Sequence, residues 1–192
     1  MKKLLITGFD PFGGQSINPS WEAVKRLPEE IGEFSLYKLQ IPTVFDLAAR
    51  CVLEKAEAVC PDVIISVGQA GSRSAVTPER VAINIRDARI PDNQGNQPLD
   101  APVVPDGPAA YFSTLPVKAM VENINQTGLP GAISNTAGTF VCNDVLYTLL
   151  HHFQGSDVRC GFIHVPWLPE QGSPNLALED IVAALTACIR AL

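Results

Sequence analysis

The sequence predicts an α/β fold, namely a three-layer α/β/α sandwich with a mostly parallel, twisted sheet and a single domain over residues 1–192. Short apolar runs with strand character alternate with longer segments whose apolar residues recur at helical spacing. The run at residues 63–67 is compact and rich in β-branched residues, which is typical of a strand buried in a parallel sheet. No segment has the composition of a linker that would divide the chain into two domains.

The first part of the chain begins this alternation. Residues 3–7 predict a strand that runs into a glycine-rich turn. Asn18 and Pro19 then predict a helix start, with Asn18 as the cap and Pro19 at the first helical position. Residues 35–41 predict a second strand, and Thr43 is expected to open the next helix.

The second part of the chain continues the pattern after one long interruption. Residues 87–116 are rich in Pro, Gly and Asn, and a loop of this length is expected to be functional, hairpin-forming or at an interface. The other predicted elements are a strand at 81–85, a helix at 117–126, a short strand at 131–134, a helix from Asn143 or Asp144 to about Phe153, a strand at 160–165 and a C-terminal helix capped by Ser173-Pro174.

Composition excludes several classes of protein. Hydrophobic residues make up 46% and charged residues 18%, which is ordinary for a globular chain. The net charge is −6 and no patch is rich in Lys or Arg, so we expect no nucleic-acid partner. The apolar run after Lys2-Lys3 is too short for a signal peptide or a membrane span, which favours a cytoplasmic protein.

Five cysteines are present, and their number is odd and their spacing wide. No CxxC pair occurs, so a zinc site is not expected, and free thiols are the default without a secretion signal. Cys142 differs from the others because small residues precede it and an apolar helix follows. Unpaired N–H groups at a helix N-terminus favour a thiolate, so we expect a lowered pKa for Cys142. The alternative is a buried structural cysteine.

A thiol nucleophile needs a base, and the chain has three histidines. His151 and His152 are adjacent near the end of a helix, where they suit its C-terminal dipole. His164 falls at the end of a predicted strand, where catalytic groups of α/β proteins lie, although a structural histidine is equally compatible with this position. Glu79 is a candidate for orienting His164, and a surface ion pair between Glu79 and Arg80 or Arg73 is an equal alternative.

The turn at residues 8–14 invites a different interpretation, as a phosphate-binding loop of a nucleotide-binding module. It lacks the lysine and the glycine spacing of such loops. Phe9 and Phe12 interrupt it, and aromatic residues on a glycine-rich turn suit the walls of a slot for a flat apolar ring. An ordinary strand-to-helix turn with core phenylalanines remains the alternative.

Four stretches together give the chain a resemblance to the pyroglutamyl peptidase I family, also called pyrrolidone-carboxylate peptidases. They are residues 8–14, 68–84, 134–143 and the Phe-Ile-His-Val-Pro segment at 162–166. The second and third correspond to the two active-site signatures of the family without a gap, and the resemblance runs nearly from end to end. It implies hydrolysis of the amide bond after an N-terminal pyroglutamyl residue of peptides and proteins, through a thioacyl-enzyme.

The resemblance also implies roles for individual residues. Cys142 would attack the amide carbonyl, His164 would serve as base and then acid, and Glu79 would orient His164. The residues implied in binding the pyroglutamyl ring and the scissile carbonyl are Phe9, Phe12, Asn18, Gln69, Arg89, Phe140 and Val141. The resemblance implies no metal and no cofactor, and it implies a homotetramer. A cysteine amidase with another small acyl substrate remains an alternative.

Overall fold

The computed structural model describes residues 1–192 and confirms the α/β class, with five helices and eight strands. In chain order these are β1 (Lys2–Phe9), α1 (Pro19–Arg26), β2 (Glu30–Ile31), β3 (Phe34–Ile41), α2 (Leu47–Val59), β4 (Val63–Gln69), β5 (Thr77–Pro78), β6 (Val81–Ile83), β7 (Ala110–Phe112), α3 (Val117–Gln126), α4 (Val141–His152), β8 (Arg159–Val165) and α5 (Leu178–Arg190).

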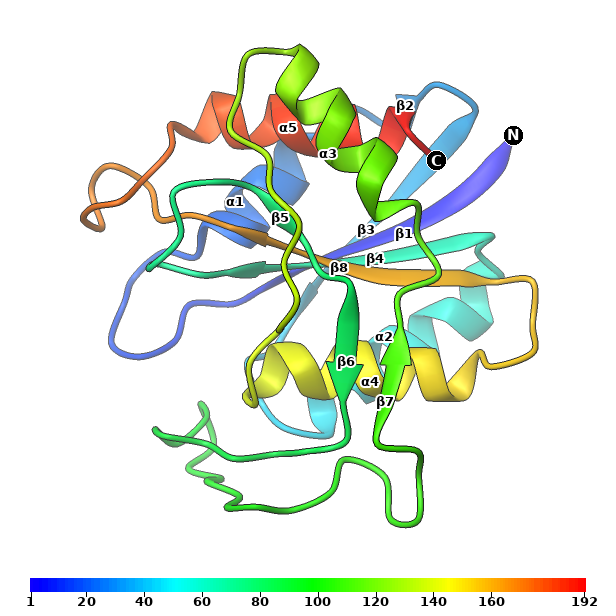
Figure 1. Cartoon of the computed structure of the whole chain (residues 1–192), viewed down its shortest axis with the longest axis vertical. Coiled ribbons are helices and arrows are strands. Elements are labelled where there is room, and N and C mark those ends of the chain that lie inside the picture. The colour runs from blue at the N-terminus through cyan, green and yellow to red at the C-terminus, as the bar shows by residue number, and fades with distance from the viewer.

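A twisted six-stranded sheet in the order β2-β3-β1-β4-β8-β5 forms the middle layer (Figure 1). The four long strands β3, β1, β4 and β8 are parallel, and the two-residue strands β2 and β5 close the edges in antiparallel pairing. Because the long strands run the same way, the carboxyl ends of β1, β4 and β8 meet at one edge, where α/β proteins bind ligands.

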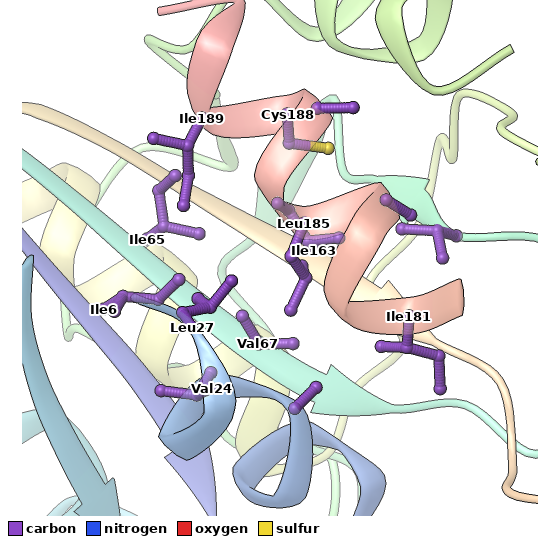
Figure 2. Packing of buried hydrophobic residues seen from close by; sticks show 14 of the residues in the cluster. Ile6, Val24, Leu27, Ile65, Val67, Ile163, Ile181, Leu185, Cys188 and Ile189 are labelled. Carbon is purple, nitrogen blue, oxygen red and sulfur yellow. The ribbon is translucent and has the colours of Figure 1, made fainter. Parts of the chain in front are cut away.

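Helices cover both faces of this sheet, as the sequence predicts. Helices α1, α3 and α5 lie on one face, and α2 and α4 lie on the other (Figure 1). On the first face, Ile6, Ile65 and Ile163 of three adjacent strands pack against Val24 of α1 and Leu185 of α5 (Figure 2).

The opposite face is built from the neighbouring residues of the same strands. Leu5, Ile64 and Phe162 belong to a second buried cluster, together with residues of α2 and α4 such as Val52 and Leu146. Successive side chains of a strand point to opposite faces, so a continuous apolar run such as 63–67 can supply both cores.

The segment predicted as a long loop contains a strand. Within residues 87–116, β7 pairs antiparallel with β6 in a separate two-stranded sheet that lies against α4 (Figure 1). The Asn143 side chain holds this sheet to α4, because it accepts from the N–H of Ile83 (3.0 Å) and donates to the carbonyl oxygens of Ile83 (2.8 Å) and Ile85 (3.1 Å).

The sequence places the start of α4 at Asn143 or Asp144, which is wrong, because the helix begins at Val141 after Phe140. Both polar side chains are fully buried and make tertiary contacts instead of capping. Asp144 accepts from the backbone N–H of Asp46 (3.0 Å) and from Nε of Arg86 (2.6 Å). The earlier start places Cys142 at the second residue of the helix.

Two other predicted caps are also wrong. Helix α2 begins at Leu47, because the carboxylate of Asp10 binds the Thr43 N–H (2.7 Å) and keeps Thr43 in the preceding turn. Helix α5 begins at Leu178 and not after Ser173-Pro174.

Two predicted strands also differ from the structure. Residues 131–134 form only isolated bridges and no strand, and β6 ends at Ile83, two residues before the predicted end at Ile85. Among the five helices, none combines the length and the apolar character that crossing a bilayer requires.

The packing of α5 against the sheet predicts how a substitution in this helix changes the free energy of unfolding. Leu185 has no exposed surface and points toward Ile163 of the sheet (Figure 2), whereas Leu99 is 69% exposed. We expect Leu185→Ala to lower the free energy of unfolding by about 2–5 kcal/mol, since it removes buried methyl groups and leaves a cavity. Leu99→Ala is the matched control and should change it by no more than about 0.5 kcal/mol. Urea denaturation measures both values, and equal losses would contradict the assigned core.

Candidate active site

The predicted nucleophile and base come together where β4 and β8 end and α4 begins. In the parallel register, Gly68 of β4 lies opposite His164 of β8. A Cβ atom added to Gly68 would lie 2.9 Å from Sγ of Cys142 and 2.7 Å from Cζ of Phe162. The absent side chain at Gly68 therefore lets the Cys142 thiol approach the sheet beside His164.

Glu79, the residue after the short edge strand β5, completes this group. In β5, Thr77 pairs with His164, and the N–H of Glu79 donates to the carbonyl of Phe162 (2.9 Å). These backbone bonds bring Oε1 of Glu79 to 2.7 Å from Nδ1 of His164. Because the carboxylate accepts the Nδ1 proton, Nε2 of His164 is left as an acceptor.

A second cation binds the same carboxylate oxygen. Nη1 of Arg73 lies 2.6 Å from Oε1 of Glu79, whose side chain has no exposed surface. The sequence analysis gives His164 and an arginine as alternative partners of Glu79, and in the structure Glu79 contacts both at once. Arg80 takes no part in them, since it donates to Oδ1 of Asn135 (2.9 Å).

The two partners shift the ionisation of the pair. Burial alone would raise the pKa of Glu79, but the hydrogen bond and charge of His164 and then the charge of Arg73 hold it below its usual value. Burial lowers the pKa of His164, and the charge of Arg73 lowers it further, against the opposing effect of Glu79. The free site therefore holds an ionised carboxylate and a neutral imidazole at neutral pH.

The expected lowering of the Cys142 pKa is wrong. Burial and then the charge of Glu79 raise the pKa of this thiol to about 12, and the opposing effect of Arg73 is smaller. Part of the residue is still exposed, but dense packing around the sulfur removes most of the water that would solvate a thiolate. The helix N-terminus does not compensate for this desolvation.

Two adjoining clefts hold several of the predicted substrate-binding residues. The rings of Phe12 and Phe140 lie 6.1 Å apart, and with Arg89 they line a cleft of about 430 Å³. Phe12 and Arg89 also line a larger cleft of about 770 Å³, which adds Gln69 and Trp167. Four of the seven predicted residues therefore lie along one continuous surface.

The other three predicted substrate-binding residues are buried. Phe9 is 2% exposed and packs against Phe162, with ring centroids 6.2 Å apart. The Asn18 side chain accepts from the N–H of Ser20 (3.1 Å), as the predicted cap of α1, and also donates to the carbonyl of Asp10. The side chain of Val141 has no exposed surface, so only its backbone is available to a ligand.

Comparison with known proteins identifies the family. A family model described as pyroglutamyl peptidase matches residues 2–192. This chain belongs to the pyroglutamyl peptidase family. A pyrrolidone-carboxylate peptidase of Levilactobacillus brevis is 55% identical, over 99% of this chain and 97% of that protein, and one of Clostridium perfringens is 53% identical, over 99% and 92%. Membership of a peptidase family decides against the nucleotide-binding alternative.

Solved structures agree with this assignment. The crystal structure of pyroglutamyl peptidase I from Bacillus amyloliquefaciens has a TM-score of 0.95 and 50% identity, covering 98% of this chain and 95% of that one. The pyrrolidone carboxyl peptidase of Thermococcus litoralis has a TM-score of 0.95 and 38% identity, covering 100% and 93%. The three-layer fold of this chain is thus that of its relatives.

Gln171 is a site residue that the sequence analysis missed. Its Oε1 accepts from the N–H of Leu168 (3.0 Å), so its Nε2 is available to donate to the carbonyl of Ile17 (3.3 Å) and to Oε1 of Gln69 (3.1 Å). This arrangement leaves the Nε2 donor of Gln69 free to face a ligand. No local sequence pattern could indicate it, because Gln69 and Gln171 are 102 residues apart.

The ionisation of the thiol can be measured directly. Because burial raises the pKa of Cys142 to about 12, we expect the free enzyme to contain a neutral thiol at neutral pH. The ultraviolet absorbance of thiolate, taken as the difference between the protein and Cys142→Ala, should appear only at strongly alkaline pH. A thiolate signal that titrates below neutral pH would show instead that His164 already holds the proton before substrate binds.

Proposed function

We propose that this chain is a cysteine peptidase that hydrolyses the amide bond after an N-terminal pyroglutamyl residue of peptides and proteins. In this proposal Cys142 is the nucleophile, His164 the base and acid, and Glu79 the residue that orients His164. The observation that carries the assignment is the 2.7 Å bond between Glu79 and His164, beside the Cys142 thiol, in a chain of the pyroglutamyl peptidase family.

Acylation would begin from the neutral pair of thiol and imidazole. As Sγ of Cys142 bonds to the carbonyl carbon, the thiol proton passes to Nε2 of His164, so no free thiolate has to form in the buried site. Glu79 stays ionised and stabilises the imidazolium. The carbonyl oxygen becomes an oxyanion, which the unpaired N–H groups of the first turn of α4 can stabilise.

Three proton transfers complete the reaction. The C–N bond breaks as His164 gives its Nε2 proton to the leaving amine, which departs as a shortened peptide and leaves a thioester on Cys142. Water then attacks the thioester while His164 takes a proton from it. When the C–S bond breaks, the proton returns to the sulfur and free pyroglutamate leaves.

The clefts suit the chemistry of this substrate. A pyroglutamyl residue is a flat lactam with no free amine and no charge, so an apolar slot with a few hydrogen-bond groups selects it. Phe12 and Phe140 supply the apolar walls, and backbone groups of Phe140 and Val141 would hydrogen-bond the ring. The Nε2 donor of Gln69 and the exposed Arg89 would face the scissile carbonyl. Phe9 and Asn18 would support this surface from below.

We infer also that residues 1–192 act as one catalytic domain, which assembles as a homotetramer in the cytoplasm. The match of the family model to residues 2–192 supports the single domain. All five cysteines are free, which suits a reducing compartment. Phe112 of β7 is 73% exposed, and an apolar side chain of this kind on the 87–116 segment suits a contact between subunits.

Removal of the thiol tests the nucleophile. We expect Cys142→Ala to abolish release of a reporter from a pyroglutamyl amide, because no other group forms the thioester, while circular dichroism shows an intact fold. Cys60→Ala is the matched control, since Cys60 is an exposed thiol at the end of α2. It should keep the activity of the unmodified protein. Full activity of the Cys142 variant would rule out the proposed mechanism.

Substrate comparison tests the acyl specificity. We expect kcat/KM for a pyroglutamyl amide to exceed that for the matching prolyl and glutaminyl amides by at least roughly 10²-fold. The prolyl ring carries a charged amine and lacks the lactam carbonyl, so it loses the hydrogen bonds of the slot, and the glutaminyl group is charged and open. Similar values for the three amides would favour an amidase with another small acyl substrate.

A further inference from the structure

Arg73 contacts the carboxylate of Glu79, but the proposed mechanism gives it no role. Its Nη1 atom contacts Oε1 of Glu79 (2.6 Å) and Oγ1 of Thr77 (2.5 Å), and its Nη2 atom contacts the carbonyl of Thr136 (2.9 Å). The side chain is 22% exposed. A planar guanidinium can make these contacts together, because its donors are fixed in one fork.

We propose that Arg73 is a positioning residue of the active site, which cancels the charge of Glu79 and fixes its carboxylate between the strand that carries the base and the loop that leads to the nucleophile. The proposal rests on the proposed catalytic roles of Glu79, His164 and Cys142. Arg73 itself touches no reacting atom in this mechanism and acts through Glu79.

The buried charge of Glu79 has few partners to compensate it. Glu79 has no exposed surface, and its Oε2 atom is buried without a hydrogen bond, while the nearby Ser134 hydroxyl donates to the carbonyl of Thr136 (3.0 Å). A buried carboxylate with so few partners would draw a proton onto the pair that it forms with His164. Besides the hydrogen bond from His164, Arg73 opposes this protonation, because a guanidinium keeps its charge at any accessible pH.

The charge of Arg73 also affects the pKa values of the neighbouring groups. The titratable side chains that face Glu79 are His164 from β8, Arg73 from the loop after β4 and Cys142 from α4. Burial is the main cause of the low pKa of His164, and the charge of Arg73 lowers that pKa further. Arg73 also opposes the rise in the pKa of Cys142. It therefore helps to keep the imidazole neutral, as a base must be, and eases loss of the thiol proton.

Arg73 also links two segments of the site. Thr77 of β5 pairs with His164 in the sheet, and Thr136 lies in the loop that leads through Phe140 to Cys142. A single guanidinium thus joins the strand paired with the base to the loop that leads to the nucleophile. A shift of the loop by about 1 Å would misplace the thiol relative to the imidazole, at a cost on the order of 10²-fold in rate.

The test compares Arg73→Gln with Arg73→Lys by measuring kcat and KM for a pyroglutamyl amide across pH. We expect Arg73→Gln to lower kcat on the order of 10²-fold with little change in KM. The acid limb of its kcat/KM–pH profile should move to higher pH. Without the positive charge of Arg73 nearby, the pair of Glu79 and His164 binds a proton more readily, whichever of the two carries it. Arg73→Lys keeps the charge, so its limb should return toward the unmodified position while kcat stays reduced.

Arg80→Gln is the matched control, since it makes the same change of charge at the residue after Glu79 without contacting the carboxylate. It should leave the limb and kcat unchanged. Titration of the His164 ring by NMR, with Cys142→Ala present in each protein, should show the same shift to higher pH for Arg73→Gln.

Several results would overturn the role of Arg73. Loss of activity in Arg73→Gln with an unmoved acid limb would mean that Arg73 serves only the fold, and an unchanged rate would remove any role. If Arg73→Gln does not fold, Arg73→Lys decides, because a variant equal to the unmodified protein in kcat and KM contradicts the proposal. Absence of activity in the unmodified protein would instead contradict the proposed function, so the two failures are distinguishable.

Discussion

A fully buried carboxylate at Glu79 is the constraint around which the site is organised. Burying an ionised group is costly unless charge and hydrogen bonds compensate it. Here His164 and Arg73 both contact Oε1, at 2.7 Å and 2.6 Å. Because each partner belongs to a different segment, the need to compensate one charge also fixes the relative positions of those segments.

The parallel sheet makes this convergence possible. Strands β4 and β8 end side by side, so Gly68 and His164 are neighbours although nearly a hundred residues separate them in the chain. Close approach then depends on the absence of a side chain at Gly68, since any Cβ would collide with Phe162 and with the Cys142 thiol. Backbone bonds of the edge strand β5 and of Glu79, the residue after it, bring Glu79 beside them. Topology, and not loop flexibility, therefore sets the geometry of the group.

The protonation state of the resting site follows from the same burial. Desolvation raises the pKa of Cys142 to about 12 and lowers the pKa of His164, so the thiol and the imidazole are both neutral before substrate arrives. In the proposed mechanism, charge then develops only when the sulfur bonds to the carbonyl carbon, where the N-terminus of α4 and the pair of Glu79 and Arg73 can stabilise it. A buried neutral thiol is also less exposed to adventitious oxidation than a permanent thiolate.

The sequence by itself determined the α/β class, because apolar periodicity reports which segments are buried on one face or on two. The cap of α1 at Asn18 and the helix at 117–126 followed from local signals and are confirmed. The family signatures indicated the site residues, whereas local patterns left Glu79 undecided. Only the tertiary structure decided that Asn143 and Asp144 make long-range contacts and do not cap α4.

The ionisation of Cys142 was also decided by the tertiary structure. Its position at a helix N-terminus predicts a stabilised thiolate, but the sequence does not show how strongly the surrounding chain desolvates the sulfur. The same holds for Arg73, which the sequence offered as a rival partner of Glu79. The sequence could not show that one carboxylate oxygen contacts both cations, because that depends on where three distant segments meet.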